Sequence, residues 1–292
     1  MPELPDVEIY VEHLKRRVLG EPLQQIRVAN PFVLRSFDPP LAEANGQAVN
    51  DVRRLGKRVV FALEDDLFLV IHLMIAGRLR WRASGAKLPG KKLVLATMEF
   101  PSGTLVLTEA GTTRRASIHL LRGEAALAEH DRGGIEPLEA TTESFAAQLR
   151  GENHTLKRSL TDPRLFSGIG NAYSDEILHR ARLSPVLLTS RMSDDDIARL
   201  IEATRAVLVE WTNRLRAESG DEFPEKVTAF HEEMAVHGRF GEPCPVCDAP
   251  VQRIRYATNE TNYCARCQTG GRLLADRALS RLLKQDWPRE LE

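Results

Sequence analysis

The chain has 292 residues, 42% of them hydrophobic, which suits a globular protein with two domains and a substantial core. Its 40 basic and 41 acidic residues give a net charge of −1, so any nucleic-acid surface must be a local patch. No apolar run reaches the roughly 18 residues of a membrane span, and the start lacks the basic-then-apolar order of a secretory signal. We therefore expect a cytoplasmic protein without membrane contact.

The first six residues place a potential secondary amine beside a carboxylate. Methionine before a small residue is normally removed, which would leave Pro2 with a free pyrrolidine nitrogen. Such an amine can form a Schiff base with an aldehyde-like carbon, and Glu3 can move the protons that this requires. Taken alone, these residues fit an unstructured start better. Pro5 and the apolar residues that recur at helical spacing until Gly20 predict a helix that carries the amine.

Between Gln24 and about Leu121 the chain contains short segments of β-forming residues separated by turn signals. This spacing predicts an antiparallel β-sandwich. A basic cluster that includes Lys57 precedes one of the segments, and His72 follows another. On pattern alone, the cluster is a solvated face and the histidine is structural. The predicted strands are 26–28, 59–63, 68–71, 93–98 and 105–107.

The pattern loosens between about Ala125 and Glu139, which we interpret as a linker before a helical half. Ser193-Asp194 suits the cap of the longest predicted helix. Gly168-Ile169-Gly170-Asn171 stands where another helix would begin, and the free N–H groups of a helix start attract phosphate. A tight turn between packed helices explains this motif equally well. The predicted helices are 145–149, 156–160, 172–182, 195–216 and 230–236.

The four cysteines form the strongest motif in the sequence. Cys244 and Cys247 form one C-x2-C pair, and Cys264 and Cys267 form a second pair after sixteen intervening residues. This spacing predicts a zinc ribbon in which four thiolates surround Zn²⁺ and leave no open coordination position. The metal would hold a β-hairpin and take no part in catalysis. Disulfides or a redox pair are disfavoured in a cytoplasmic chain.

These motifs occur in the order found in the formamidopyrimidine-DNA glycosylase and endonuclease VIII family, which the chain resembles from residue 1 to about 268. The resemblance rests on Met1–Asp6, Lys57, Gly168–Glu176 and the cysteine ribbon. It implies an α+β multidomain fold with an N-terminal helix and antiparallel β-sandwich, a helix-two-turn-helix domain and a zinc-ribbon hairpin. The expected domains are 1–130, 131–236 and 237–270, followed by a helical tail at 271–292.

The resemblance further implies a base-excision DNA glycosylase with abasic-site (AP) lyase activity, which binds damaged double-stranded DNA as a monomer and holds structural zinc. Pro2 matches the nucleophile that attacks C1′ of the damaged nucleoside, and Glu3 matches its acid–base partner. Lys57 matches a lysine that contacts phosphate and assists the β- and δ-elimination steps. The DNA contacts implied by the resemblance are His72, Lys157, Gly170, Asn171 and residue 259, with Arg114 or Arg115 able to insert into the duplex.

The chain departs from the family pattern at residues that contact DNA. Asn259 stands where typical members have an arginine that clamps phosphates. Ile75 occupies the usual place of an intercalating methionine, and the loop 109–117 lacks the usual phenylalanine. A second hypothesis therefore stays open: a DNA-damage or abasic-site binding protein, or a glycosylase for an unusual lesion, on the same scaffold. Oxidised purines lead as the lesion class by resemblance, ahead of oxidised pyrimidines and abasic sites.

Overall fold

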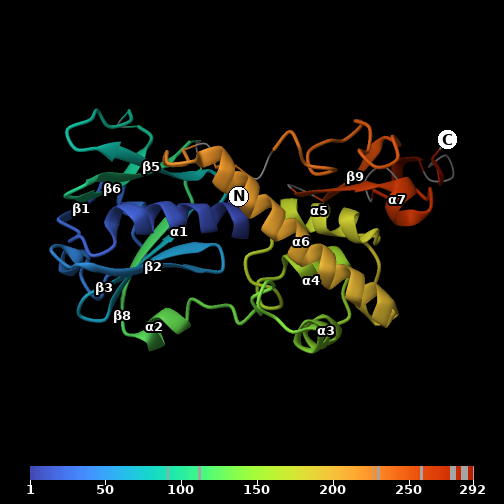
Figure 1. Ribbon diagram of the computed structural model, residues 1–292, viewed down its shortest axis with the longest axis horizontal. Helices are drawn as coiled ribbons and strands as arrows, with labels where there is room; N and C mark the ends of the chain where they lie inside the picture. The colour runs from blue at the N-terminus through green and yellow to red at the C-terminus, as the bar shows by residue number, and fades with distance from the viewer. Residues whose placement is uncertain are drawn as a thin grey trace. The chain divides into compact units, whose positions relative to one another are not determined.

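The computed structural model describes residues 1–90, 92–110, 113–225, 227–228, 231–256, 259–276, 281–283 and 289–291 (Figure 1). The chain divides into two compact units. Unit 1 comprises Met1–Arg132 and Trp211–Thr228, and unit 2 comprises Gly133–Glu210 and Ala229–Glu292. The chain therefore passes from unit 1 to unit 2, back to unit 1 and again to unit 2.

Unit 1 contains the N-terminal helix α1 (Leu4–Val18), two four-stranded antiparallel sheets and a short helix α2 (Glu124–Ala128). The order of strands is β1-β6-β7-β5 in one sheet and β2-β3-β4-β8 in the other. Short 3₁₀ turns occupy Pro31–Val33 and Leu41–Ala44. The strands are β1 (Gln25–Val28), β2 (Val49–Leu55), β3 (Arg58–Leu63), β4 (Leu67–His72), β5 (Gly77–Ala83), β6 (Val94–Phe100), β7 (Gly103–Glu109) and β8 (Ser117–Arg122).

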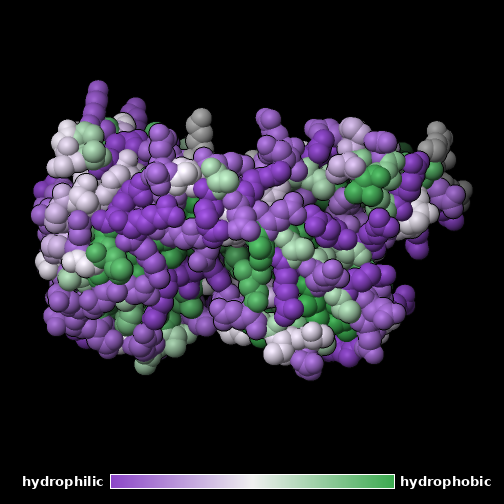
Figure 2. All heavy atoms as spheres, in the orientation of Figure 1, coloured by the Kyte–Doolittle hydropathy of each residue, from purple (hydrophilic) through white to green (hydrophobic). Residues whose placement is uncertain are grey.

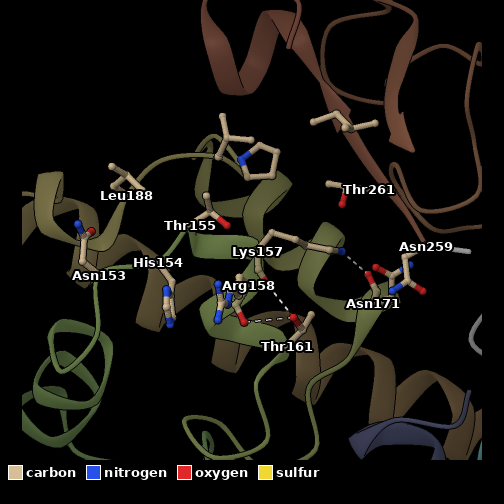
Figure 3. Close-up of a pocket in the computed structure, with 13 residues that line it drawn as sticks. Asn153, His154, Thr155, Lys157, Arg158, Thr161, Asn171, Leu188, Asn259 and Thr261 are labelled. Carbon is tan, nitrogen blue, oxygen red and sulfur yellow. Dashed lines mark hydrogen bonds between the residues drawn. The ribbon is translucent and has the colours of Figure 1, made fainter. Parts of the chain in front are cut away.

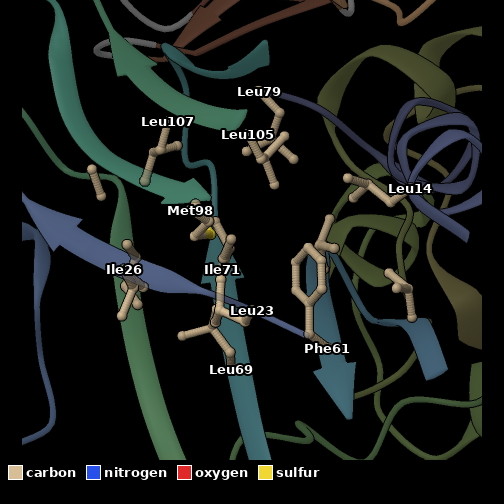
Figure 4. Packing of buried hydrophobic residues seen from close by; sticks show 14 of the residues in the cluster. Leu14, Leu23, Ile26, Phe61, Leu69, Ile71, Leu79, Met98, Leu105 and Leu107 are labelled. Atoms are coloured by element: carbon tan, nitrogen blue, oxygen red, sulfur yellow. The ribbon is translucent and has the colours of Figure 1, made fainter. Parts of the chain in front are cut away.

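The core of unit 1 lies between the two sheets and confirms the predicted antiparallel sandwich. Phe61, Leu69 and Ile71 from one sheet pack in the same buried cluster as Met98 and Leu107 from the other (Figure 4). Successive residues of a strand point to opposite faces, and the sheet β2-β3-β4-β8 is buried on both: Val60, Phe68 and Val70 form a second buried cluster with Leu127 of α2. The apolar face of α1 joins the first cluster, which anchors the start of the chain to the sandwich.

Unit 2 consists of helices and a small zinc-ribbon-like hairpin, which packs against two of the helices, α5 and α7. Ser193 caps the longest helix, because its Oγ accepts from Asp196 N at 3.1 Å and Ser193 N donates back to Asp196 Oδ2 at 3.0 Å. The hairpin pairs β9 and β10 in an antiparallel register. The elements are α3 (Thr142–Arg150), α4 (Leu156–Thr161), α5 (Asn171–Ala181), a 3₁₀ turn (Thr189–Arg191), α6 (Asp194–Ser219, whose last part belongs to unit 1), β9 (Val251–Tyr256), β10 (Asn259–Cys264) and α7 (Ala265–Thr269).

The helix predicted at 230–236 is wrong for residues 231–236, while Phe230 lies outside the described residues. The N–H groups of Ala235, Val236 and His237 donate to the Glu176 carboxylate at 2.7–2.9 Å. A distant carboxylate thus takes the place of the carbonyl acceptors that a helix would supply.

The described ends of the C-terminal tail lie against each other. Leu273 N donates to Arg289 O at 2.8 Å and Leu291 N donates to Gly271 O at 2.9 Å. Of the tail predicted to be helical, residues 281–283 are helical, but the prediction is wrong for 271–276 and 289–291, where Arg272 and Glu290 form an antiparallel bridge. Residues 277–280, 284–288 and 292 lie outside the described residues.

The face shown in Figure 2 is mainly hydrophilic, with hydrophobic residues in separate groups. Exposed apolar side chains of this kind are normal on globular proteins. Among the described residues, no helix combines the length and the apolar character that crossing a membrane requires.

Candidate functional site

Pro2 and Glu3 lead directly into α1, and both are buried. Glu3 is the N-cap residue of the helix. Its N–H donates to Asp6 Oδ2 at 2.8 Å, and the two residues form a capping box. The helix start therefore fixes the backbone beside Pro2. With Met1 attached, the Pro2 nitrogen is part of an amide, so removal of Met1 is required before this nitrogen can act as an amine.

The N-terminal amine lies among two carboxylates and two cations. Burial lowers the pKa of the Met1 amine, against the opposing attraction of Glu3 and Asp6, and the charges of Arg78 and Lys57 lower it further. A lowered pKa leaves more of the amine in the neutral form, which has the free lone pair that a nucleophile needs. Lys57 lies in the turn between β2 and β3, so the structure brings it together with Glu3 around the N-terminus.

His72, the last residue of β4, is neutral at pH 7. Burial lowers its pKa to about 4, and the nearby charges of Arg58 and Lys57 act in the same direction. Its Nδ1 accepts a hydrogen bond from Met74 N at 3.0 Å. An acceptor at Nδ1 places the ring proton on Nε2, so Nε2 is the nitrogen that can donate to a phosphate.

The loop between β4 and β5 presents Ile75. Gly77 N donates to Leu73 O at 2.9 Å, and Met74 adopts a φ of 53°, a conformation uncommon for residues that carry a Cβ. Ile75 is 62% exposed, whereas Leu73 is buried. An exposed apolar side chain on a rigid loop has the character of the wedges that proteins insert between base pairs.

Arg114 and Arg115 lie in the loop that follows β7, and both are exposed. Arg114 donates to the carbonyl of Lys92, and the backbone N–H groups of Arg115 and Ala116 donate to the buried carboxylate of Glu109. Glu109 therefore shapes the described part of this loop, a role that the sequence did not reveal. Residues 111 and 112 of the loop lie outside the described residues.

A cavity of about 600 Å³ in unit 2 brings together three of the predicted DNA-binding residues (Figure 3). Lys157, Arg158, Asn171 and Asn259 line it, and Gly170 is the N-cap residue of α5 beside it. In Figure 3 the Lys157 side chain extends toward Asn171, with Asn259 close to Asn171. Cations, amides and a helix start are the groups that hold a DNA backbone without reading its sequence.

The polar groups of Lys157 and Asn171 are engaged within unit 2. Lys157 Nζ donates to the buried Asp175 Oδ1 at 2.5 Å and to the Asn171 carbonyl at 2.6 Å. Asn171 Nδ2 donates to the carbonyl of Glu260 at 2.8 Å. Sequence reasoning missed Asp175 as part of this group. Its position four residues after Asn171 in a helix was the available signal, because such residues share a helix face.

Asn259 is exposed at the start of β10, next to an acidic residue. The Glu260 carboxylate lies 3.6 Å from Arg253 and 3.4 Å from Arg255 on β9. The Arg253 guanidinium also lies 4.0 Å from the centre of the Phe240 ring. The described part of the hairpin therefore holds two arginines close to a carboxylate, and Asn259 adds no positive charge.

The four cysteines converge as the sequence predicts. Their sulfur atoms all lie within 4.8 Å of one another, with Cys244 Sγ 3.9 Å from Cys267 Sγ and Cys247 Sγ 3.4 Å from Cys264 Sγ. A tetrahedral site with Zn–S bonds of about 2.3 Å requires sulfurs about 3.8 Å apart, so the cluster fits Zn²⁺. His179 is buried next to this cluster, and burial lowers its pKa to about 4.

Three family models match the chain in succession. The models for the formamidopyrimidine-DNA glycosylase N-terminal domain, the formamidopyrimidine-DNA glycosylase H2TH domain and the zinc finger found in FPG and IleRS match residues 1–116, 134–216 and 241–270. The formamidopyrimidine-DNA glycosylase of Thermus thermophilus is 34% identical over 284 residues, which cover 93% of this chain and 100% of the relative. That of Symbiobacterium thermophilum is 31% identical over 281 residues, with 92% and 89% covered.

Solved structures of similar proteins contain damaged DNA. The Lactococcus lactis enzyme in complex with DNA containing an abasic site is 26% identical, has a TM-score of 0.80, and covers 91% of this chain and 99% of its own. MutM in complex with DNA containing carbocyclic 8-oxo-G is 26% identical with a TM-score of 0.80, covering 92% and 100%.

The β-sandwich, the H2TH helices and the four-cysteine ribbon together define a DNA glycosylase of base-excision repair, a class that combines base removal with AP lyase activity. The chain belongs to the formamidopyrimidine-DNA glycosylase family. Its four cysteines form the structural zinc site of the finger.

Proposed function

We propose that the chain excises damaged bases from double-stranded DNA with the Pro2 amine as nucleophile. The observation that carries this proposal is the grouping of Glu3, Asp6, Lys57 and Arg78 around the partly buried Met1 amine, whose pKa is lowered and which stands one residue before Pro2. This environment favours a neutral amine beside a carboxylate that can exchange protons with it. The reaction needs a flipped nucleotide, since C1′ of a stacked base pair is out of reach of a protein amine.

The steps follow from the groups present. The Pro2 nitrogen attacks C1′ as the bond from C1′ to the base breaks, and the base leaves with a proton from the surroundings. Opening of the sugar ring gives an iminium at C1′, with Glu3 passing a proton to the ring oxygen. Loss of a C2′ proton then expels the 3′ phosphate by β-elimination, and δ-elimination expels the 5′ phosphate. Lys57 assists elimination by holding a phosphate with its positive charge.

The DNA is held by groups that contact its backbone. His72 contributes a neutral N–H donor. The cavity in unit 2 contributes Lys157, Asn171 and Asn259, which line it, together with Gly170 at the start of α5. Arg114 or Arg115 enters the duplex together with Ile75, which replaces the usual methionine. Contacts of this kind position DNA with little sequence preference.

The substrate is a damaged base, with oxidised purines as the leading class. The structures of relatives with abasic-site and 8-oxo-G DNA support this choice. We place the working enzyme in the cytoplasm, on the nucleoid when it is bound to DNA. The segments 1–130, 131–236, 237–270 and 271–292 serve as its catalytic domain, helix-two-turn-helix domain, zinc finger and tail, except that residues 211–228 of the second segment belong to the compact unit of the first.

A DNA-damage binding protein is the second candidate. It is motivated by the uncharged Asn259 and by the acidic Glu260 beside it, because both reduce the charge that a turnover enzyme uses to grip phosphate. Such a protein would bind abasic-site DNA without forming a covalent bond to it.

Borohydride trapping on an abasic-site duplex separates the two candidates. Protein shown by mass spectrometry to begin at Pro2 should form a reduced covalent adduct, because borohydride reduces an iminium to a stable amine. A preparation that retains Met1 should give no adduct at Pro2, since its Pro2 nitrogen is an amide, and any adduct that it forms should map to another amine such as that of Met1. An adduct at a residue other than Pro2 in protein that begins at Pro2 would refute the Pro2 assignment.

The role of Glu3 needs a substrate that carries a base. Glu3→Gln should retain DNA binding and lose excision of a damaged base. Unchanged excision by this variant would remove Glu3 from the mechanism.

A further inference from the structure

One face of α5 contacts the zinc ribbon at three successive turns. Asn171, Asp175 and His179 are spaced by four residues, so they project from the same side of the helix. Asn171 reaches the carbonyl of Glu260 in β10 at 2.8 Å, and Asp175 accepts from the N–H of Asn262 two residues further along that strand at 3.1 Å. His179 reaches the zinc-ligand cluster itself. The three contacts follow the ribbon from its hairpin to its metal.

Asp175 connects this face with the DNA-facing cavity. Its side chain is fully buried, and Oδ1 accepts from Lys157 Nζ at 2.5 Å. Its other oxygen, Oδ2, accepts from Asn262 N and lies 2.8 Å from His237 Nδ1. A buried carboxylate is tolerated only when donors compensate its lost hydration. One carboxylate thus fixes a cation of the cavity and a strand of the ribbon relative to each other.

His179 contacts a zinc ligand. Its Nε2 lies 3.2 Å from Cys244 Sγ, and both residues are buried. A cysteine bound to zinc is a thiolate, which has no proton to donate, so the hydrogen bond must run from Nε2–H to sulfur. Four thiolates place more negative charge around the ion than Zn²⁺ neutralises, and an N–H donor stabilises the excess.

We propose that Asp175 and His179 are positioning residues that fix the zinc ribbon on α5, His179 by donating to the zinc-bound thiolate of Cys244 and Asp175 by holding β10 together with Lys157. Through this face, zinc binding near the C-terminal end of α5 is coupled to phosphate binding at its N-terminal end. The coupling rests on the DNA binding of the proposed function, whereas the His179 contact does not depend on it.

Coupling has a reciprocal consequence that can be measured. If zinc holds the ribbon in the arrangement that binds phosphate, then bound DNA must strengthen zinc binding by the same factor. The experiment therefore measures zinc affinity by equilibrium competition with a chelator, first without DNA and then with a duplex that contains a tetrahydrofuran abasic-site analogue.

The first arm, without DNA, tests His179. His179→Phe keeps an aromatic ring but removes the donor, and its zinc affinity should fall by about 10–100-fold, as for other lost contacts to metal ligands. His179→Gln restores a donor and should recover part of this loss. Arg180→Ala, which removes an exposed ion pair with Glu210 at the next helix position, should leave zinc affinity nearly unchanged. Equal zinc affinities for wild type and His179→Phe would show that the hydrogen bond from His179 to Cys244 Sγ does not stabilise zinc binding, contrary to the proposal.

A measurement on the unaltered sequence covers the case in which His179→Phe does not fold. In protein loaded with an NMR-active cadmium isotope, the proton on His179 Nε2 should show scalar coupling to the metal through Cys244 Sγ. A folded, loaded protein without this coupling would equally overturn the contact.

The second arm, with the duplex, tests Asp175. In wild type the DNA should raise zinc affinity by about tenfold, within the usual range of coupling energies. Asp175→Asn keeps the side-chain shape but loses the charge that holds Lys157. The ratio of zinc affinity with the duplex to zinc affinity without it should therefore fall toward one. If the duplex raises zinc affinity equally in wild type and in Asp175→Asn, the proposed role of Asp175 is wrong. A wild type that does not bind the duplex would contradict the proposed function and the coupling together, while the first arm would still decide the His179 contact.

Discussion

His72 shows how its surroundings decide the chemistry of a single residue. Burial and the adjacent cations lower its pKa to about 4, so its ring is neutral at pH 7. The Met74 N–H occupies Nδ1 and directs the remaining proton to Nε2. Its proposed contact to phosphate would therefore be a directional hydrogen bond and not an ion pair, unlike the contacts proposed for Lys57 and Lys157.

This assignment predicts the response of DNA binding to substitution of His72. His72→Gln retains an N–H donor and should bind an abasic-analogue duplex with nearly wild-type affinity. His72→Ala should lose about tenfold, the usual effect of removing a hydrogen bond to a charged group. Neither variant should change the slope of affinity against salt, because no cation is removed. A shallower slope for His72→Ala, measured by fluorescence anisotropy across salt concentrations, would contradict the neutral contact.

At position 259, adding a charge should strengthen the grip on DNA. Asn259→Arg should create a charge-assisted phosphate contact of about 1.5–3 kcal/mol, which tightens binding by about one to two powers of ten. The salt slope should steepen by about 0.9. Ala147→Arg adds the same charge to the exposed face of α3 and serves as the control. Equal gains in DNA affinity for the two variants would show that the gain comes from net charge alone. No gain in affinity for Asn259→Arg would mean that DNA does not approach Asn259.

The segments that escaped prediction are three strands, whose cause is tertiary, and the short helices α2 and α7, which are too short to show a helical period. The sequence predicted α1, five of the eight sandwich strands and the helices α3 to α6, because their apolar residues recur at regular spacing. It did not predict β2, β5 or β8. Arg53 and Arg54 of β2 looked like a basic cluster, yet they pair with Glu124 and Glu8, and Arg80 and Arg82 of β5 pair with Glu225. Partners so distant in sequence leave no local signal.

The loop between β4 and β5 depends on one glycine. A Cβ on Gly77 would lie 2.3 Å from the carbonyl oxygen of Leu73, and this contact is with the backbone, which cannot move away at low cost. Gly77 also closes the turn that exposes Ile75. The shape of the loop is therefore limited by space at Gly77 and not by the sequence at its exposed tip.

Gly77→Ala should therefore destabilise unit 1 by about 1–3 kcal/mol, the usual range for overpacking. It should also reduce base excision, because Ile75 would no longer be held in place. Gly90→Ala is the matched control, since nothing lies within 4 Å of the Cβ it would add. Chemical denaturation measures the free energy of unfolding, and the rate of excision of a damaged base tests whether the loop holds Ile75 in place. Wild-type behaviour of Gly77→Ala in both assays would show that the loop adapts.

At the scale of the whole molecule, buried histidines make folding sensitive to acid. Burial lowers the pKa of His119 to about 4, and the charges of His130, Arg58 and Arg35 act in the same direction. The ring of His119 lies 4.6 Å from that of His130, and its Nδ1 has no hydrogen-bond partner within the described part of the chain. In the unfolded chain the same histidine protonates at about pH 6.5.

The unfolded state therefore binds more protons than the folded state between about pH 6.5 and pH 4. The contribution of His119 to stability is fully present above pH 6.5 and is lost as the pH falls toward 4. The free energy of unfolding should fall between pH 7 and pH 5, and it should fall less in His119→Gln. Comparing the two proteins removes the effect of acid on the cysteine ligands, which is common to both. Parallel pH profiles would contradict this assignment.

The site residues could be predicted from the sequence only where they belong to a recognisable motif. The cysteines converge as their spacing predicted, and Lys157, Asn171 and Asn259 share a cavity. Asp175 and His179, which contact these groups, were missed, as was Glu109 in the loop that follows β7. A buried polar residue owes its role to partners that only the folded chain brings near it. The individual catalytic and DNA-binding assignments stay predictions until the variants above are measured.

The return of residues 211–228 to unit 1 limits how this chain can exchange parts with a relative by recombination. Phe223 packs against Tyr10 and Trp81, with ring centres 5.7 and 6.3 Å apart, and Glu225 pairs with Arg80 and Arg82. A crossover between two genes near residue 133 would join an N-terminal half from one parent to a Phe223 and Glu225 from the other. Functional chimeras should therefore arise mainly when the two parents match at these contacts, even though the linker looks like the natural place to cut.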